Sequence, residues 1–188
     1  MKIEPAIVVS VIAVVVAAGS AAISFWNYRR ELLNQKIQAA KWQKEYFSDL
    51  VKWSDESMLL LSEALHLCDL DPQKCEKGKF FDNRHTLRIK LSAQIDKGRW
   101  FFANYASDQY GQHKEEAFRG YRHQVLDGLV FAYRAVTELN YVDISKNGPA
   151  REAINRAKRQ FTSEIQKVLA PESRDAEFKK LTQLVGPA

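Results

Sequence analysis

Residues Ala6 to Trp26 form an uncharged apolar run, and this run constrains the fold more than any other part of the sequence. It reads AIVVSVIAVVVAAGSAAISFW, and its only polar side chains are those of three serines. Its 21 residues, at about 1.5 Å per residue, span the hydrocarbon layer of a bilayer, which is roughly 30 Å thick. The run therefore predicts one transmembrane helix.

A buried core helix and a cleaved signal peptide also fit an apolar run. Uncharged stretches of about 18 or more residues are rare in soluble cores, which disfavours the core helix. Ser20-Ala21-Ala22 matches a small-residue cleavage site. However, the run exceeds the roughly 7–15 residues of a signal-peptide core, and Glu4 offsets the charge of Lys2. A membrane anchor is the favoured interpretation, and a signal peptide is the main alternative.

Cationic residues on either side of the run predict its orientation. Lys2 alone precedes it, whereas five cationic residues follow it closely: Arg29, Arg30, Lys36, Lys41 and Lys44. Because cationic flanks stay in the cytoplasm, we expect the N-terminus outside and the C-terminal domain in the cytoplasm, at the inner membrane of a bacterium.

Small residues recur within the run. Ala13, Ala17 and Ala21 follow one another at four-residue spacing, so they share one face of a helix. Such a stripe lets a second transmembrane helix pack closely. Alanine is also common in membrane helices that act as monomeric anchors, so the sequence leaves both interpretations open.

A helical pattern continues beyond the run, since neither Gly nor Pro occurs between Ser20 and Asp71. Apolar residues there alternate at spacings of four and three, with Lys44 and Ser54 as interruptions: Leu33, Ile37, Ala40, Phe47, Val51, Met58, Leu61, Leu65 and Cys68. This 3.5-residue period predicts packing against another helix, in a coiled coil between chains or in a bundle within one chain. The bundle is favoured for the second half, because further leucines widen the stripe. Ser54 as an N-cap would place a break near Trp53.

Three further helices are predicted over residues 86–104, 114–141 and 149–170, and a short closing helix near 178–185. The stretch 125–133 is apolar nearly all round, so we expect it in the central, most buried helix. No strand pattern of useful length occurs. The predicted fold class is all-α: an N-terminal transmembrane helix followed by an antiparallel helical bundle with a long first helix.

This interpretation divides the chain into four segments. We expect a short N-terminal tail over residues 1–5, a transmembrane helix over 6–26, a helical stalk over 27–53 and a cytoplasmic helical bundle over 54–188. The 162 residues after the run suit one domain.

Charged residues lie among aromatics between Leu91 and Tyr133, and they are the candidate site. Asp96 and Arg99 are three residues apart, and Arg119, His123 and Asp127 follow at four-residue steps on one face of the predicted third helix. They form either a polar network that fixes the register of the bundle or a binding pocket. The structural network is favoured, because charges that enter a helical core are normally paired.

Catalytic alternatives have weaker support. His123 and Asp127 have the residue types of a base and its orienting partner, but the sequence places no Ser or Cys nucleophile beside them. Arg119 and His123 resemble, at a shorter spacing, the Arg-His pair of helical HEPN-type ribonucleases. The sequence predicts no enzyme, cofactor or metal site, with a helical hydrolase or nuclease as an alternative.

The charge balance bears on possible partners. The chain has 28 Lys and Arg against 23 Asp and Glu, and this net charge of +5 suits an anionic membrane or a polyanion without selecting either. Basic and aromatic residues between Arg84 and Phe102 also fit a nucleic-acid surface. A solvated basic face beside core aromatics is the favoured interpretation, so a nucleic-acid partner is not expected.

Two strings between Leu91 and Tyr133 resemble known proteins. SAQIDKGRWFFAN and KEEAFRGYRHQVLDGLVFAY are similar to segments of uncharacterised small bacterial membrane proteins with one N-terminal helix and a helical cytoplasmic part. Some small membrane proteins of this layout are effectors of phage-defence systems, including retrons. The resemblance covers about a quarter of the chain, and it implies this layout without assigning a role to any residue.

Together these patterns predict a membrane-anchored helical interaction protein. We expect it to contact the lipid bilayer and to bind a protein partner, or to self-associate, at the cytoplasmic membrane face. The alternative from another class is a membrane-disrupting effector of a retron-like phage-defence system.

Overall fold

The computed structural model describes residues 5–76 and 78–170, with side chains from residue 12 onward. Within these ranges the chain forms helices and one isolated β-bridge, and it forms no strand. The elements are α1 (Pro5–Asp69), α2 (Lys79–Gly98), the 3-10 turn η1 (Glu116–Phe118), α3 (Gln124–Thr137), the 3-10 turn η2 (Ile144–Asn147) and α4 (Gly148–Leu169). The all-α prediction is confirmed. The closing helix predicted near 178–185 lies outside the described residues.

The described residues belong to two compact units that divide between Tyr46 and Phe47. In the first unit, every side chain from Ile12 to Trp26 is exposed on α1. Across the described part of the chain, no helix has the length and apolar character needed to cross a membrane. The predicted span begins at Ala6, and the side chains of residues 6–11 lie outside the described set, so the transmembrane helix stays a prediction.

In the second unit, the core face of α1 is a seven-residue repeat. Three sets of residues recur at this spacing and are all buried: Leu50, Ser57 and Ala64; Trp53, Leu60 and Leu67; Ser54, Leu61 and Cys68. The predicted period is confirmed, but its phase is wrong in part, because Val51 is exposed and Met58 and Leu65 are only half-buried. The buried face of α1 is therefore centred near Ser57 and Ala64, two small residues that lie outside the predicted stripe.

The break considered near Trp53 is absent from α1. Ser54 does not cap a new helix, because its hydroxyl donates a hydrogen bond of 2.7 Å to the carbonyl oxygen of Val51 in the preceding turn. This back-bonding satisfies a serine inside a helix without ending it.

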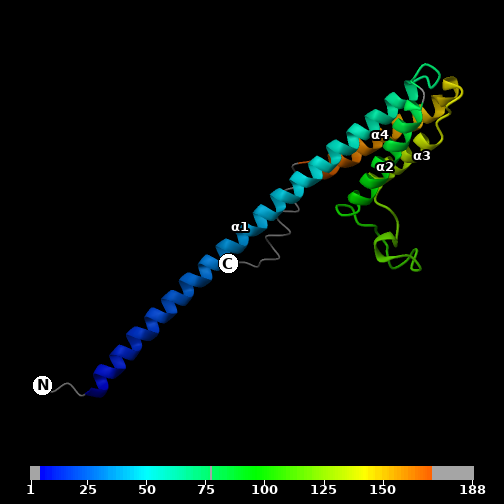
Figure 1. Cartoon of the computed structure of the whole chain (residues 1–188). Helices are drawn as coiled ribbons and strands as arrows, with labels where there is room; N and C mark the ends of the chain where they lie inside the picture. Colours follow the sequence, from blue (N-terminus) through cyan, green and yellow to red (C-terminus); the bar gives the residue numbers. More distant parts are fainter. Residues whose placement is uncertain (1–4, 77, 171–188) are drawn as a thin grey trace. The chain divides into compact units, whose positions relative to one another are not determined.

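Polar contacts show that α2 and α4 both run antiparallel to α1, as Figure 1 shows. On α2, the carbonyl oxygen of Gln94 accepts a hydrogen bond from the indole of Trp53, and Lys90 forms an ion pair with Glu63. Later residues of α1 therefore contact earlier residues of α2. Against α4 the order is reversed in the same way: Asp69 pairs with Arg151 at 2.9 Å, and Ser62 accepts a bond of 2.8 Å from Lys158. The predicted antiparallel bundle is confirmed for these elements.

Helix α3 is the most buried helix of the bundle, as its apolar sequence predicts. It packs tightly on α4 because Gly128 has no side chain: a Cβ there would lie 2.9 Å from the carbonyl oxygen of Ala157. At its end, the buried Asn147 amide binds both backbone groups of Asn140, accepting from its N–H at 2.7 Å and donating to its carbonyl at 3.0 Å. These contacts fix the turn between α3 and α4.

Two helices begin elsewhere than predicted. Helix α2 begins at Lys79 instead of residue 86, because Gly78 adopts a left-handed φ of 89° at the N-cap and Phe80 is buried in the first turn. Helix α3 begins at Gln124 instead of residue 114. The backbone at Arg119 is extended and Gly120 has a φ of 80°, so no helix passes through this segment.

We expect Gly98→Ala to destabilise the bundle by about 1–3 kcal/mol, as overpacking does. A Cβ at Gly98 would overlap the side chain of Leu126 and lie 2.6 Å from Cζ2 of Trp53. Urea unfolding followed by far-ultraviolet circular dichroism measures the loss.

Gly148→Ala is the matched control. A Cβ at Gly148 meets nothing within 4 Å, and the φ of −51° suits alanine, so the free energy of unfolding should stay within about 0.5 kcal/mol or rise. Equal losses in both variants would contradict the close packing at Gly98.

Candidate functional site

Residues 99–123 connect α2 to α3, include the 3-10 turn η1, and are named here the α2–α3 loop. Figure 1 shows it extending beyond the ends of α2 and α3. Two of its first residues pack on α1: the rings of the half-buried Phe101 and the buried Phe102 lie 5.8 and 5.7 Å from that of Trp53. The loop therefore starts from the packed core of the bundle.

Three tyrosines, named here the tyrosine stack, order the middle of the loop. Tyr105 and Tyr121 form the isolated β-bridge, with reciprocal backbone hydrogen bonds of 3.0 and 2.8 Å. The Tyr121 ring lies 5.7 Å from the Tyr105 ring and 5.0 Å from the Tyr110 ring, and it is nearly parallel to the latter. The Lys114 ammonium lies 5.3 Å from the Tyr110 ring centroid. These contacts hold the loop in one conformation.

Gly120 makes the stack possible. Its N–H donates a bond of 2.7 Å to the carbonyl of Tyr110, and a Cβ at this position would overlap the carbonyl oxygen of Tyr105. Its φ of 80° is also strained for any other residue.

Arg99 connects the end of α2 to the loop. Its Nη1 lies 3.4 Å from both Asn104 Oδ1 and the carbonyl oxygen of Ala117, and its guanidinium carbon lies 4.5 Å from the Phe118 ring centroid. Its Nε lies 3.7 Å from Asp96 Oδ1, within ion-pair range but beyond hydrogen-bond range. The predicted pairing of Asp96 with Arg99 is thus present, and most of the Arg99 contacts are with the loop.

The other three predicted residues do not share a helix face. Arg119 lies in the loop, where its Nε donates a bond of 2.8 Å to the carbonyl of Lys114. His123 is the N-cap of α3, and its Nδ1 accepts a bond of 3.3 Å from the N–H of Val125. The prediction of one continuous row is wrong, because α3 begins only after His123.

Asp127 belongs to a different pair from the one expected. Its Oδ1 lies 3.2 Å from Nη1 of Arg122, and both side chains are about one-third exposed, at 29% and 33%. Its position in the first turn of α3 adds a favourable interaction with the helix dipole. Partly exposed pairs contribute about 0–1 kcal/mol, so this one orients Arg122 more than it stabilises the bundle.

These residues surround a pocket of about 610 Å³, named here the loop pocket. Three cations and two carboxylates contribute to its lining: Arg99, Lys114, Arg122, Glu115 and Asp127. All three tyrosines of the stack line it as well. Of the five predicted residues, Arg99 and Asp127 line this pocket, whereas Asp96, Arg119 and His123 do not.

Aromatic side chains around the loop pocket are exposed. Three aromatics that line the pocket are at least 49% exposed: Tyr105, Tyr110 and Tyr121. Trp100, which follows Arg99 in the loop, is 78% exposed. Phe118 adds an exposed ring beside Arg99. Tyr, Trp and Arg are the residues that most often dominate the energy of protein interfaces.

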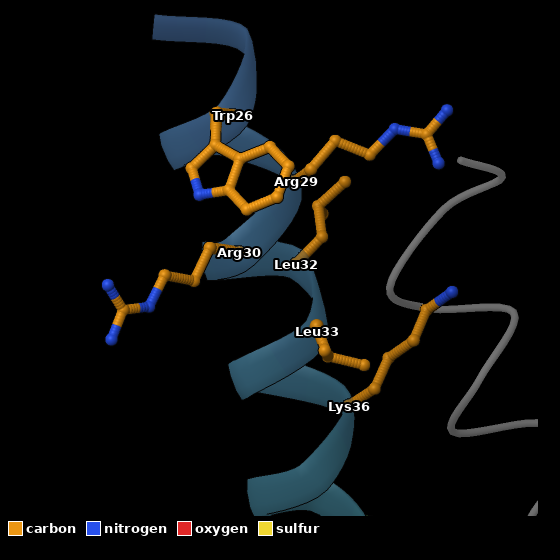
Figure 2. A pocket seen from close by; sticks show the side chains of 6 residues that line it. All are labelled: Trp26, Arg29, Arg30, Leu32, Leu33 and Lys36. Atoms are coloured by element: carbon orange, nitrogen blue, oxygen red, sulfur yellow. The ribbon is translucent and has the colours of Figure 1, made fainter. Parts of the chain in front are cut away.

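The first unit has a separate group of aromatic and cationic residues on α1. Trp26, Arg29 and Lys36 line a second pocket with Arg30, Leu32 and Leu33; Figure 2 shows Arg29 and Lys36 on one side of the helix and Arg30 on the other. The guanidinium of Arg29 lies 5.4 Å from the Phe25 ring centroid.

The predicted packing stripe lies on the same helix. Ala13, Ala17 and Ala21 are exposed on α1, with no described residue covering them. The stripe therefore stays a prediction.

Comparisons with protein-family models, curated proteins and solved structures found no significant match.

Sequence reasoning missed the tyrosine stack, Lys114 and Arg122 as site residues. A loop was expected over residues 105–113, but the spacing of Phe118, Tyr121 and Val125 at three and four residues predicted a helix over the second part of the α2–α3 loop. Gly111 and Gly120 were the available signal, since both adopt positive φ angles between closely spaced tyrosines.

Proposed function

We propose that the chain is a membrane-anchored interaction protein without enzymatic activity, and that it presents the α2–α3 loop to a protein partner at the cytoplasmic face of the inner membrane. The observation that carries this proposal is the group of exposed aromatic side chains and partly buried arginines around the loop pocket. A flexible loop would lose conformational entropy on binding, whereas this one is already ordered by the tyrosine stack.

The anchor is supported by the first unit. Apolar side chains are exposed on every side of α1 from Ile12 to Phe25, and so large an apolar surface requires lipid or protein to cover it. Trp26, Arg29 and Arg30 follow directly, which is the order of aromatic and cationic residues at the cytoplasmic interface of a membrane helix.

The geometry at α3 gives no support to the hydrolase or nuclease alternative. A base and its orienting partner must be hydrogen-bonded to each other. Nδ1 of His123 instead caps α3, and the carboxylate of Asp127 pairs with Arg122. Arg119 is bound to the backbone of Lys114.

The two cysteines are free thiols of different accessibility. Cys68 is buried, and burial raises the pKa of its thiol to about 11, with a further contribution from the Asp69 carboxylate. Its thiolate is therefore scarce at neutral pH, and Cys68 reacts slowly. Cys75 is half-buried in the loop after α1, so it is the natural reporter of topology.

We expect the full chain to resist extraction from membranes by alkaline carbonate, and the variant lacking residues 1–26 to be released as a helical soluble protein.

We also expect a membrane-impermeant maleimide to label Cys75 only after cells are lysed, because the cationic flank holds the second unit in the cytoplasm.

The control for labelling is Cys75→Ser, which should lose most of the signal because Cys68 is buried. Labelling of Cys75 in intact cells, or a mature N-terminus near Ile23, would contradict the proposed topology.

We expect a photo-crosslinking amino acid at Trp100 to form adducts with another protein in the membrane fraction. The same amino acid at Leu59, which is 60% exposed on α1 of the same unit, is the matched control and should form few. Equal adducts from both positions would contradict the assignment of the partner surface to the loop. If the adducts join only two copies of this chain, the loop mediates self-association and does not bind a different protein.

A further inference from the structure

We propose that the loop pocket receives a carboxylate side chain from an acidic segment of the partner protein. This inference rests on the proposed function, because it specifies the chemistry of the partner that the loop binds. It follows from two arginines in one pocket that retain unused donors, from the charge of the lining, and from the aromatic side chains around it.

The donors belong to Arg99 and Arg122, which both line the pocket. Each has a buried Nε that makes no hydrogen bond to any described residue. Nη1 of Arg122 donates a hydrogen bond to Asp127. Nη1 of Arg99 donates to Asn104 Oδ1 and to the carbonyl oxygen of Ala117, both at 3.4 Å, which is at the long end of hydrogen-bond range. A guanidinium has five N–H donors arranged to bind carboxylates in a bidentate manner.

The charges in the lining favour an anion. Three cations face two carboxylates, which leaves one positive charge in excess. Asp127 already engages Arg122, and Asp96, the ion-pair partner of Arg99, does not line the pocket. The Lys114 ammonium lies over the Tyr110 ring, which does not neutralise it.

The aromatic surroundings favour a peptide over an isolated anion. Tyr105, Phe118 and Tyr121 line the pocket with the arginines, are exposed, and offer contact area to apolar side chains next to the acidic residue. A free phosphate ion would use none of this area. The volume of about 610 Å³ lies within the roughly 300–1,000 Å³ range of ligand sites in proteins, so the pocket has room for a carboxylate side chain.

Asp127 sets a distinctive test, because its carboxylate competes with the incoming one for Arg122. Asp127→Asn removes this competitor and one negative charge while keeping the shape of the side chain. The variant should therefore bind acidic ligands more tightly than the wild type.

The experiment uses the full chain in phosphatidylcholine nanodiscs and an eight-residue probe peptide in which aspartate and glutamate alternate with leucine. Its twin carries asparagine and glutamine at the same positions. We expect the acidic peptide to bind at least fivefold more tightly than its twin at physiological salt. Equal binding of the two peptides would overturn the proposal.

Arginine variants locate the binding. Arg122→Gln should weaken binding of the acidic peptide about tenfold, and Asp127→Asn should strengthen it. Arg159→Gln, on the exposed surface of α4, removes the same charge and should leave binding unchanged. Equal weakening by Arg159→Gln, or no gain from Asp127→Asn, would show general charge attraction and overturn the proposal.

Two competitors distinguish other anions. Displacement of the acidic peptide by an equal concentration of inorganic phosphate, or by nanodiscs containing phosphatidylglycerol, would overturn the peptide assignment in favour of that anion. The experiments distinguish failure of the acidic-peptide proposal from failure of the proposed function. If crosslinks from Trp100 to a partner persist while both peptides bind equally, the loop is still the partner surface and only the acidic chemistry is wrong.

Discussion

The packing around Trp53 is the interaction on which the rest of the bundle depends. Its indole N–H donates a hydrogen bond of 3.0 Å to the carbonyl oxygen of Gln94, and its ring lies 5.7 Å from that of Phe161. It thereby joins α1 to α2 and α4 at once. Gly98 lacks a side chain at the point where this ring and Leu126 meet α2. No smaller or more flexible residue at position 53 would make all these contacts.

The same packing determines where the candidate site begins. Phe101 and Phe102 close on Trp53 directly after α2 ends, so the α2–α3 loop leaves the bundle from a fixed point. Phe102 also contacts the ring of His123, at 4.9 Å, where the loop enters α3. Both ends of the loop are therefore fixed by the core, and the tyrosine stack orders its middle. Exposed aromatic side chains and partly buried arginines on such a support are suited to recognising a partner rather than to enclosing a reaction.

The sequence predicted the helices better than the loop, for physical reasons. Helix α4 was predicted closely because Pro149 suits a first turn and Ile154, Ala157 and Phe161 repeat at helical spacing. The seven-residue spacing of α1 was predicted correctly, but some of the buried positions were not, because small buried residues such as Ser57 carry no hydrophobic signal. The loop was expected only over residues 105–113, and its continuation to residue 123 was missed because a positive φ at Gly120 outweighs the helical spacing around it. The arginine contacts depend on backbone carbonyls that only the folded loop brings together.

Hydrogen exchange after Trp53→Phe tests most directly whether the core supports the site. The substitution keeps an aromatic ring but removes the indole donor and part of the buried surface. The account predicts faster amide exchange in both the last turn of α2 and the α2–α3 loop. Trp42→Phe is the control, because Trp42 stacks on Tyr46 in the first unit, and it should leave exchange in the second unit unchanged. Faster exchange in α2 with no change in the loop would contradict the account.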